Sequence, residues 1–126
     1  MRIDNECVRN ILFTIEENSS FNQPCCMSNS QEYPKLRDFE IDKIAYHLRY
    51  LKMKGLIFDF NSERLVSHYD LTPDGHEFLA NIRNENNWNK IKGISSTIGF
   101  ASLKIISAIA EGVATAAINQ QLGLSE

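Results

Sequence analysis

Two stretches near the start of the chain carry apolar side chains at the three- and four-residue spacing of an α-helix. The first covers residues 4–18, and its apolar face consists of Val8, Ile11, Leu12 and Ile15. The second covers residues 38–54, and its apolar face consists of Ile41, Ile44, Ala45, Leu48 and Leu51. Asp4 and Asp38 are suitable N-caps, and Gly55 is a helix stop after the second stretch. The pattern predicts two amphipathic helices.

Short β-rich runs follow the second helix. Residues 56–60 and 65–71 are rich in apolar, aromatic and β-branched side chains, and the polar residues 61–64 connect them. This arrangement predicts an antiparallel hairpin. Thr72 can then cap a third helix that has Pro73 in its first turn. The apolar face of this third helix consists of Phe78, Leu79, Ile82, Trp88 and Ile91. The predicted fold class is therefore mainly α with a small β-hairpin.

Residues 19–37, between the first two helices, are rich in proline, serine and asparagine and predict mostly loop, with a short extended piece near residues 25–27. The three cysteines, Cys7, Cys25 and Cys26, are an odd number without CxxC spacing. Reduced thiols and a cytoplasmic location are expected. A zinc site using the vicinal pair and a histidine is an alternative that lacks the usual spacer between ligands. We expect no metal and no other cofactor.

An apolar segment of different character covers residues 94–124. Its polar side chains recur at three or four residues and are Lys104, Ser107, Glu111, Thr115 and Asn119. A helix with so narrow a polar stripe needs cover over most of its circumference. We therefore predict a domain of residues 1–92 and an apolar C-terminal helix in residues 93–126. The polar residues 84–89 permit a break or kink within the third helix.

Two ways of covering the C-terminal helix remain open, which are oligomerisation and packing on its own domain. Ala108, Gly112 and Ala116 are spaced by four and allow close approach of another helix. The candidate oligomerisation residues, for an expected homodimer, are Leu103, Ile106, Ile109, Gly112, Val113 and Ala116. A membrane span is disfavoured because Lys104 and Glu111 would each cost about 2.5–3.5 kcal/mol at mid-bilayer.

Composition and charge narrow the function classes. The chain has 126 residues, of which 43% are hydrophobic and 23% charged, so we expect one globular domain with an accessory element. The formal net charge is −3, and any contact with DNA must therefore come from a local basic patch. The sequence carries no phosphate-binding glycine loop, no metal-spaced histidine motif and no nucleophile elbow, and we expect no enzymatic activity.

Several motifs in register resemble known proteins. A helix, a second helix ending in Gly-Leu-Ile, a hairpin and Leu-Thr-x-x-Gly opening a third helix are similar to the winged helix-turn-helix. The carrying residues are Leu48, Leu51, Gly55, Leu56, Ile57, Leu71, Thr72 and Gly75. Residues 3–92 also resemble an uncharacterised family of small proteins of bacteria, phages and prophages. That likeness is carried by residues 8–12, 44–48, 55–57, 71–72, 75–79 and 88–90.

The winged-helix resemblance implies that the helix of residues 38–54 is a recognition helix. Six cations and three acids fall between Lys35 and Lys54, a local net charge of +3. Lys and Arg there can neutralise phosphates, while His47 and Tyr50 can reach base edges or sugars. The candidate DNA-binding residues are Lys43, His47, Arg49, Tyr50 and Lys54 on one exposed helix, with Arg64 at the hairpin tip. The first hypothesis is a dimeric transcriptional regulator of phage or prophage type that binds double-stranded DNA.

A protein–protein interaction module on the same scaffold, binding a host or phage protein, is the alternative. The acids Asp38, Glu40 and Asp42 crowd the N-terminus of the second helix, which approaches DNA in helix-turn-helix docking and would there repel phosphate. A bracing helix between the first and second helices is also hard to find in residues 19–37. Both hypotheses therefore stay open at the level of sequence.

Overall fold

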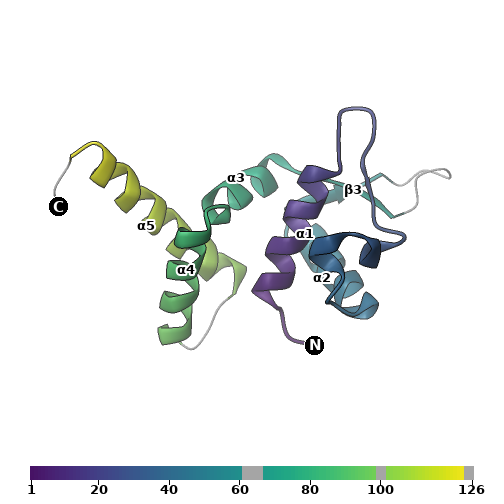
Figure 1. The fold of residues 1–126 in the computed structure, drawn as a ribbon, viewed down its shortest axis with the longest axis horizontal. Helices are drawn as coiled ribbons and strands as arrows, with labels where there is room; N and C mark the ends of the chain where they lie inside the picture. Colours follow the sequence, from purple (N-terminus) through teal and green to yellow (C-terminus); the bar gives the residue numbers. More distant parts are fainter. Residues whose placement is uncertain (61–66, 99–101, 124–126) are drawn as a thin grey trace. The chain divides into compact units, whose positions relative to one another are not determined.

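The chain forms two compact units, Met1–Leu79 and Ala80–Glu126. The computed structural model describes residues 1–60, 67–98 and 102–123, and within these ranges it confirms a mainly α fold with a small antiparallel sheet (Figure 1). The helices are α1 (Asn5–Glu17), α2 (Ile41–Met53), α3 (Pro73–Ile82), α4 (Glu85–Ile98) and α5 (Leu103–Gln121). The strands are β1 (Cys25–Cys26), β2 (Ile57–Asp59) and β3 (His68–Leu71), and two 3₁₀-helices are η1 (Ser30–Glu32) and η2 (Pro34–Leu36).

Helix α1 begins as the sequence predicts. The Asp4 side chain accepts hydrogen bonds from the backbone N–H groups of Glu6 (2.9 Å) and Cys7 (3.3 Å), which satisfies two of the donors that a helix start leaves unpaired. The predicted apolar face is confirmed, because Val8, Ile11, Leu12 and Ile15 are all buried. Helix α1 is therefore a central element of the core of Met1–Leu79.

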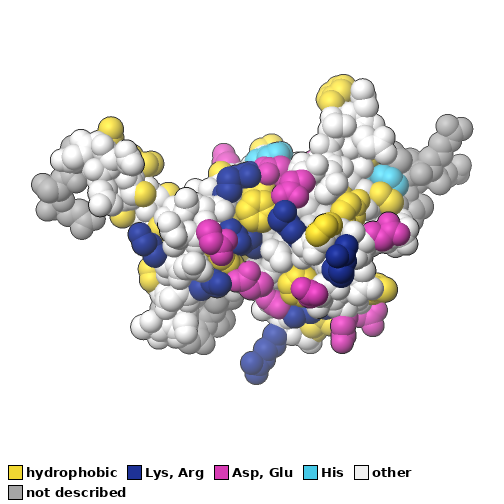
Figure 2. Space-filling view, viewed as in Figure 1, with side chains coloured by type: hydrophobic (Ala, Val, Ile, Leu, Met, Phe, Trp, Pro, Cys, Tyr) yellow, Lys and Arg dark blue, Asp and Glu magenta, His cyan; other side chains and the backbone are white. Residues whose placement is uncertain are grey.

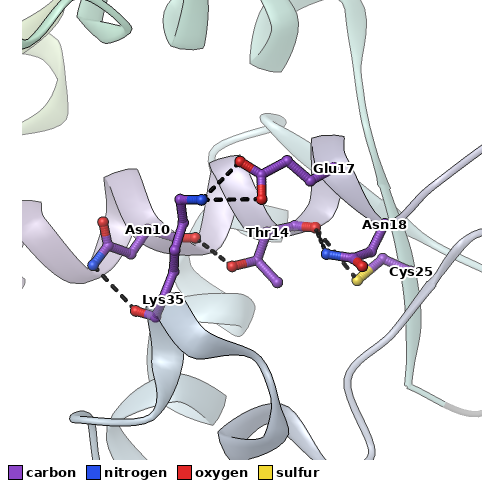
Figure 3. A network of polar contacts seen from close by, with 6 residues as sticks. All are labelled: Asn10, Thr14, Glu17, Asn18, Cys25 and Lys35. Atoms are coloured by element: carbon purple, nitrogen blue, oxygen red, sulfur yellow. Dashed lines mark hydrogen bonds and ion pairs between the residues drawn. The ribbon is translucent and has the colours of Figure 1, made fainter.

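Polar contacts from α1 hold the segment that precedes α2 (Figure 3). The Asn10 side-chain amide donates to the carbonyl of Lys35 (3.1 Å), and the Lys35 ammonium pairs with Glu17 (2.8 Å). The Cys25 thiol makes a long contact (3.9 Å) with the carbonyl oxygen of Thr14. Residues 19–37 thus contain β1 and two short 3₁₀-helices, rather than a full helix, between α1 and α2.

The three strands form a sheet in the order β1-β3-β2, with both pairings antiparallel. Cys25 pairs with Tyr69, and Ile57 pairs with Leu71. The predicted hairpin is confirmed by the pairing of β2 with β3, and its connecting residues 61–66 lie outside the described residues. The extended piece expected near residues 25–27 is β1, so the chain before α2 also contributes to the sheet.

Hydrogen bonds join the end of α2 to the start of α3, and we call this junction the corner. Gly55 has φ +76°, a left-handed conformation that glycine adopts without strain. The Thr72 hydroxyl donates to the carbonyl of Gly55 (2.6 Å) and accepts from the N–H of Gly75 (3.0 Å), while the Thr72 N–H donates to the carbonyl of Leu56 (3.1 Å). Thr72 is therefore the predicted N-cap of α3 and at the same time a tether to the end of α2.

The unit Ala80–Glu126 contains the end of α3, together with α4 and α5, which pack against each other. Its buried side chains are Ile82, Trp88, Ile91, Ser95, Leu103, Ile106 and Ala110. The unit begins within α3, whereas the sequence predicts a division at residue 92. Residues 94–98, predicted to belong to the C-terminal helix, instead end α4. Helix α5 begins after its N-cap Ser102, whose hydroxyl accepts a hydrogen bond from the N–H of Ile105 (3.2 Å).

Candidate nucleic-acid interface on α2

The exposed face of α2 differs from the predicted one. His47 was expected to face solvent but is fully buried with Ile44, Leu48 and Leu51, whereas Ile41 and Ala45, expected in the core, are exposed. The helix is thus turned about its axis relative to the prediction. The positions on the side of the helix opposite the buried residues, at i, i+4, i+7 and i+11, are Asp42, Tyr46, Arg49 and Met53, of which Tyr46 is half-buried and the others are exposed. We call these four residues the outer stripe.

His47 is buried because the chain before α1 supplies a partner for each ring nitrogen. The backbone N–H of Asp4 donates to Nε2 of His47 (2.8 Å), so Nδ1 carries the proton and donates to the carbonyl of Lys43 (2.8 Å). A buried polar ring is tolerated when its hydrogen bonds are made. This imidazole fixes the contact between α1 and α2, and the prediction that His47 lies on the exposed face of the helix is wrong.

Lys43 is also engaged, because its ammonium lies 2.6 Å from the Asp4 carboxylate, and about a third of each side chain is exposed. Burial would by itself raise the pKa of Asp4, but the hydrogen bond from Lys43, the N–H groups of Cys7 and Glu6, and the charge of Lys43 together lower it. The hydrogen bond to Asp4 raises the pKa of Lys43. If Lys43 bound a phosphate, its ion pair with Asp4 would have to break.

The Asp4→Asn variant tests the ion pair through its pH dependence. Because the pKa of Asp4 is lowered in the folded state, its charge stabilises the fold above the ordinary value near 3.8, and this contribution is lost as the pH falls through the folded pKa. Asparagine still caps α1. We expect the variant to be less stable by about 0.5–1 kcal/mol at pH 7 in urea unfolding, and the difference to shrink as the pH falls below 3.8. A constant difference at all pH values would contradict this, and the exposed Asp38→Asn serves as control.

The remaining cations of α2 lie beside tyrosine rings or an acid. The Arg49 guanidinium carbon is 5.2 Å from the centre of the Tyr46 ring, and the Lys54 ammonium is 6.0 Å from that of Tyr50. These are cation–π distances, which hold the side chains against the helix surface. Lys52 pairs with Asp59 of β2 (2.8 Å), and this hydrogen bond raises the pKa of Lys52. Arg49 of α2 and Lys54, the C-cap that follows it, are therefore the exposed cations here for which the described residues show no ion pair.

A shallow concavity of about 330 Å³ lies on the same helix and is lined by Tyr46, Arg49, Tyr50 and Met53. Three of these residues belong to the outer stripe, which sequence reasoning had not grouped together. Arg64, the predicted contact at the hairpin tip, lies outside the described residues. Of the predicted DNA-binding residues, Arg49, Tyr50 and Lys54 thus lie near one another on the surface, and Tyr46 and Met53 join them. His47 no longer belongs to this set because it is buried, and Lys43 is held in an ion pair with Asp4.

The charge around this surface is mixed. Residues 1–79 contain nine Lys and Arg residues and thirteen Asp and Glu residues, a formal net charge of −4. On the face shown in Figure 2, basic and acidic side chains are interspersed rather than gathered into a continuous basic area. Contacts with a polyanion would therefore depend on a few positions of α2.

The predicted oligomerisation residues divide into two groups. Leu103 and Ile106 are buried in the unit that contains them. Ile109 and Val113 are half-buried, and Gly112 and Ala116 are exposed. These four residues are the part of the predicted set that a second copy of the chain could still contact. No helix in the described part of the chain is both long and apolar enough to span a membrane.

The cysteines are free thiols that pack within Met1–Leu79. Burial raises the pKa of Cys7 to about 12, and burial likewise raises the pKa of Cys25, so these two thiols stay protonated at neutral pH. Among the described residues no three His, Cys, Asp or Glu side chains gather as metal ligands would.

Fold and site define a small, mainly helical protein in which a three-stranded antiparallel sheet positions one partly exposed helix, α2. The chain belongs to the family described as Hypothetical protein (DUF2513), whose model matches residues 2–101. It is also similar to an "Uncharacterized protein" of Haemophilus influenzae, with 35% identity over 88 residues that cover 67% of this chain and 72% of that protein. No solved structure matches the chain. The expected resemblance to an uncharacterised family is thereby confirmed.

Proposed function

We propose that this chain is a winged helix-turn-helix protein of phage or prophage type, a non-enzymatic cytoplasmic regulator that binds double-stranded DNA as a dimer. One observation carries the proposal. The elements run α1, β1, a pair of short 3₁₀-helices, α2, β2 and β3, with the sheet in the order β1-β3-β2. In a winged helix-turn-helix the helix that precedes the hairpin enters the major groove, and here that helix is α2.

The chemistry of α2 supports a small set of DNA contacts. Arg49 lies in the middle of the outer stripe, where a guanidinium can donate two hydrogen bonds to a guanine edge. Lys54, at the C-terminal end of α2, can neutralise a phosphate, and Tyr50 can donate to one. Asp42 opposes binding at the N-terminal end, so the proposed interface uses the C-terminal half of the helix.

Charge reversal at Arg49 and Lys54 tests this interface. The wild-type protein is expected to bind random duplex DNA weakly, with an affinity that falls steeply with salt. The Arg49→Glu/Lys54→Glu variant should lose this binding, or reduce the slope of log affinity against log salt by about one, since the phosphate contact of Lys54 disappears. Fluorescence anisotropy of a labelled duplex across a salt series measures both quantities.

The matched control is Lys90→Glu/Lys104→Glu, which makes the same change in net charge at two exposed lysines of Ala80–Glu126. It should bind like the wild type. Equal loss in both variants would show that only total charge matters and would remove α2 as the interface. Light scattering on the same preparations should show a dimer, and a monomer would remove dimerisation from the proposal.

An interaction module that binds a host or phage protein is the second candidate, and a specific observation favours it. Met53 is 81% exposed and Ile41 is 62% exposed, and both belong to α2. Methionine, tyrosine and arginine are enriched at protein–protein interfaces, and the net charge of −4 over residues 1–79 disfavours DNA. This candidate predicts no salt-dependent binding of random duplex by the wild-type protein.

A further inference from the structure

A groove of about 360 Å³ lies between residues 27–32 and the N-terminal half of α2. In Figure 1 this segment is the dark blue stretch that passes in front of α2, and η1 packs against that helix. The volume is in the range of sites that accommodate small ligands or a pair of side chains. The outer stripe of α2 contributes none of the lining residues.

The floor of the groove is apolar and continues onto the surface. Met27, Ile44 and Leu48 are almost completely buried and form the floor, whereas Ile41 and Ala45 are exposed and form the lip on α2. The apolar spacing along α2 predicts that Ile41 and Ala45 lie in the core. Because α2 is instead rotated about its axis so that His47 is buried, the side chains of Ile41 and Ala45 are uncovered beside the groove.

The opposite side of the groove is polar and carries one charge. Gln31 donates through its side-chain amide to the carbonyl of Phe39 (2.9 Å), and Ser28 contacts the thiol of Cys26 (3.4 Å), so both are engaged. Glu32 is exposed and is the single charged residue among those that line the groove, and the described residues show no ion pair for its carboxylate. The groove thus combines an apolar floor with one acidic group at its edge.

We propose that this groove binds a segment of a partner protein that carries a basic side chain beside an apolar one. The apolar side chain would lie over Ile44 and Leu48 and contact Ile41, and the basic side chain would pair with Glu32. Charge complementarity selects this occupant, because Glu32 supplies the local charge and the net charge of −4 over residues 1–79 attracts a cationic partner. The inference goes beyond DNA binding by the outer stripe and does not depend on it.

Two tripeptides that differ only in the sign of one charge test the groove. The full chain, labelled with ¹⁵N, is titrated with acetylated and amidated Leu-Lys-Leu or Leu-Glu-Leu at millimolar concentration. Leu-Lys-Leu should shift the backbone amide signals of residues 28–32 and 41–48. Leu-Glu-Leu should bind about threefold more weakly or not at all, as expected for the loss of one exposed ion pair.

The Glu32→Gln variant should bind both peptides equally, whereas Glu77→Gln, which neutralises an exposed acid of α3 outside the groove, should retain the preference. Absence of groove shifts with Leu-Lys-Leu, equal binding of both peptides by the wild type, or an unchanged preference in Glu32→Gln would each overturn the proposal. Shifts of the same amides by duplex DNA would assign the groove to the nucleic-acid interface and overturn it as well. The DNA experiment on Arg49 and Lys54 fails or succeeds separately from these outcomes.

Discussion

Gly75→Ala is expected to lower the free energy of unfolding by about 3 kcal/mol, because the added methyl group has no space at the corner. A Cβ atom at Gly75 would overlap the carbonyl oxygen of Leu56 and lie 3.0 Å from its carbonyl carbon. Both are backbone atoms, and the N–H of Thr72 already binds that carbonyl, so neither side can withdraw without breaking the link between α2 and α3. Urea unfolding followed by circular dichroism measures the loss.

Gly93→Ala is the matched control for this prediction. Gly93 is an exposed residue inside α4, and a Cβ atom there meets no other group within 4 Å. Alanine should therefore stabilise the helix by about 0.5–1 kcal/mol, the opposite sign from Gly75→Ala. If Gly75→Ala unfolds within 0.5 kcal/mol of the wild type, the close approach at the corner is not a feature of the molecule in solution.

Trp88→Ala is expected to cost about 3–5 kcal/mol, the largest effect of any single truncation in Ala80–Glu126. The indole is 1% exposed and is the largest of the fully buried side chains, and it lies on α4, which packs against α5. Its removal leaves a cavity that the neighbouring aliphatic side chains fill only in part. Urea unfolding by circular dichroism, with hydrogen exchange to locate the affected amides, measures the result.

Asn89→Ala provides the comparison at the adjacent position. Asn89 is exposed in the same helix, and alanine there should leave stability unchanged or raise it by about 0.5 kcal/mol. The contrast between neighbouring positions separates loss of packing from a general effect on α4. A Trp88→Ala variant that keeps wild-type stability and exchange protection in α4 and α5 would show that the two helices do not depend on this side chain.

Elements defined by local signals could be predicted from the sequence. Asp4 caps α1, Gly55 ends the turn after α2 in a left-handed conformation, and Thr72 caps α3, as their residue types indicate. Each of these interactions joins atoms a few residues apart. These short-range signals locate the start of α1, the end of α2 and the start of α3. The predicted start of α2 is wrong, because the helix begins at Ile41 after Glu40 and not after Asp38.

The face of α2 could not be predicted, because a distant group decides it. Apolar spacing fits a core containing Ile41 and Ala45 as well as one containing His47, and hydrophobicity favours the first. The backbone N–H of Asp4, 43 residues away, supplies the hydrogen bond that makes burial of His47 favourable. Sequence periodicity contains no information on that partner, so the prediction placed His47 on the exposed side of α2 and placed Ile41 and Ala45 on the buried side.

The tail shows a related limit of helical periodicity. Residues 94–98 and 103–121 both fit one long apolar helix, yet they belong to α4 and α5, and a serine N-cap begins the second. Pairing the two helices covers Leu103 and Ile106, which a single straight helix would have exposed. The sequence predicts that the apolar C-terminal helix must be covered, but it does not predict that a helix of the same unit covers it.

The corner has a consequence for how this family can diverge. Its three hydrogen bonds connect Gly55, Leu56, Thr72 and Gly75 through space, and none of them involves the chain that runs between Leu56 and Thr72. Insertions or deletions in that stretch can therefore lengthen or shorten the hairpin without loosening its base. Relatives are expected to vary most in hairpin length, and least in the glycine and the Thr-x-x-Gly that flank it.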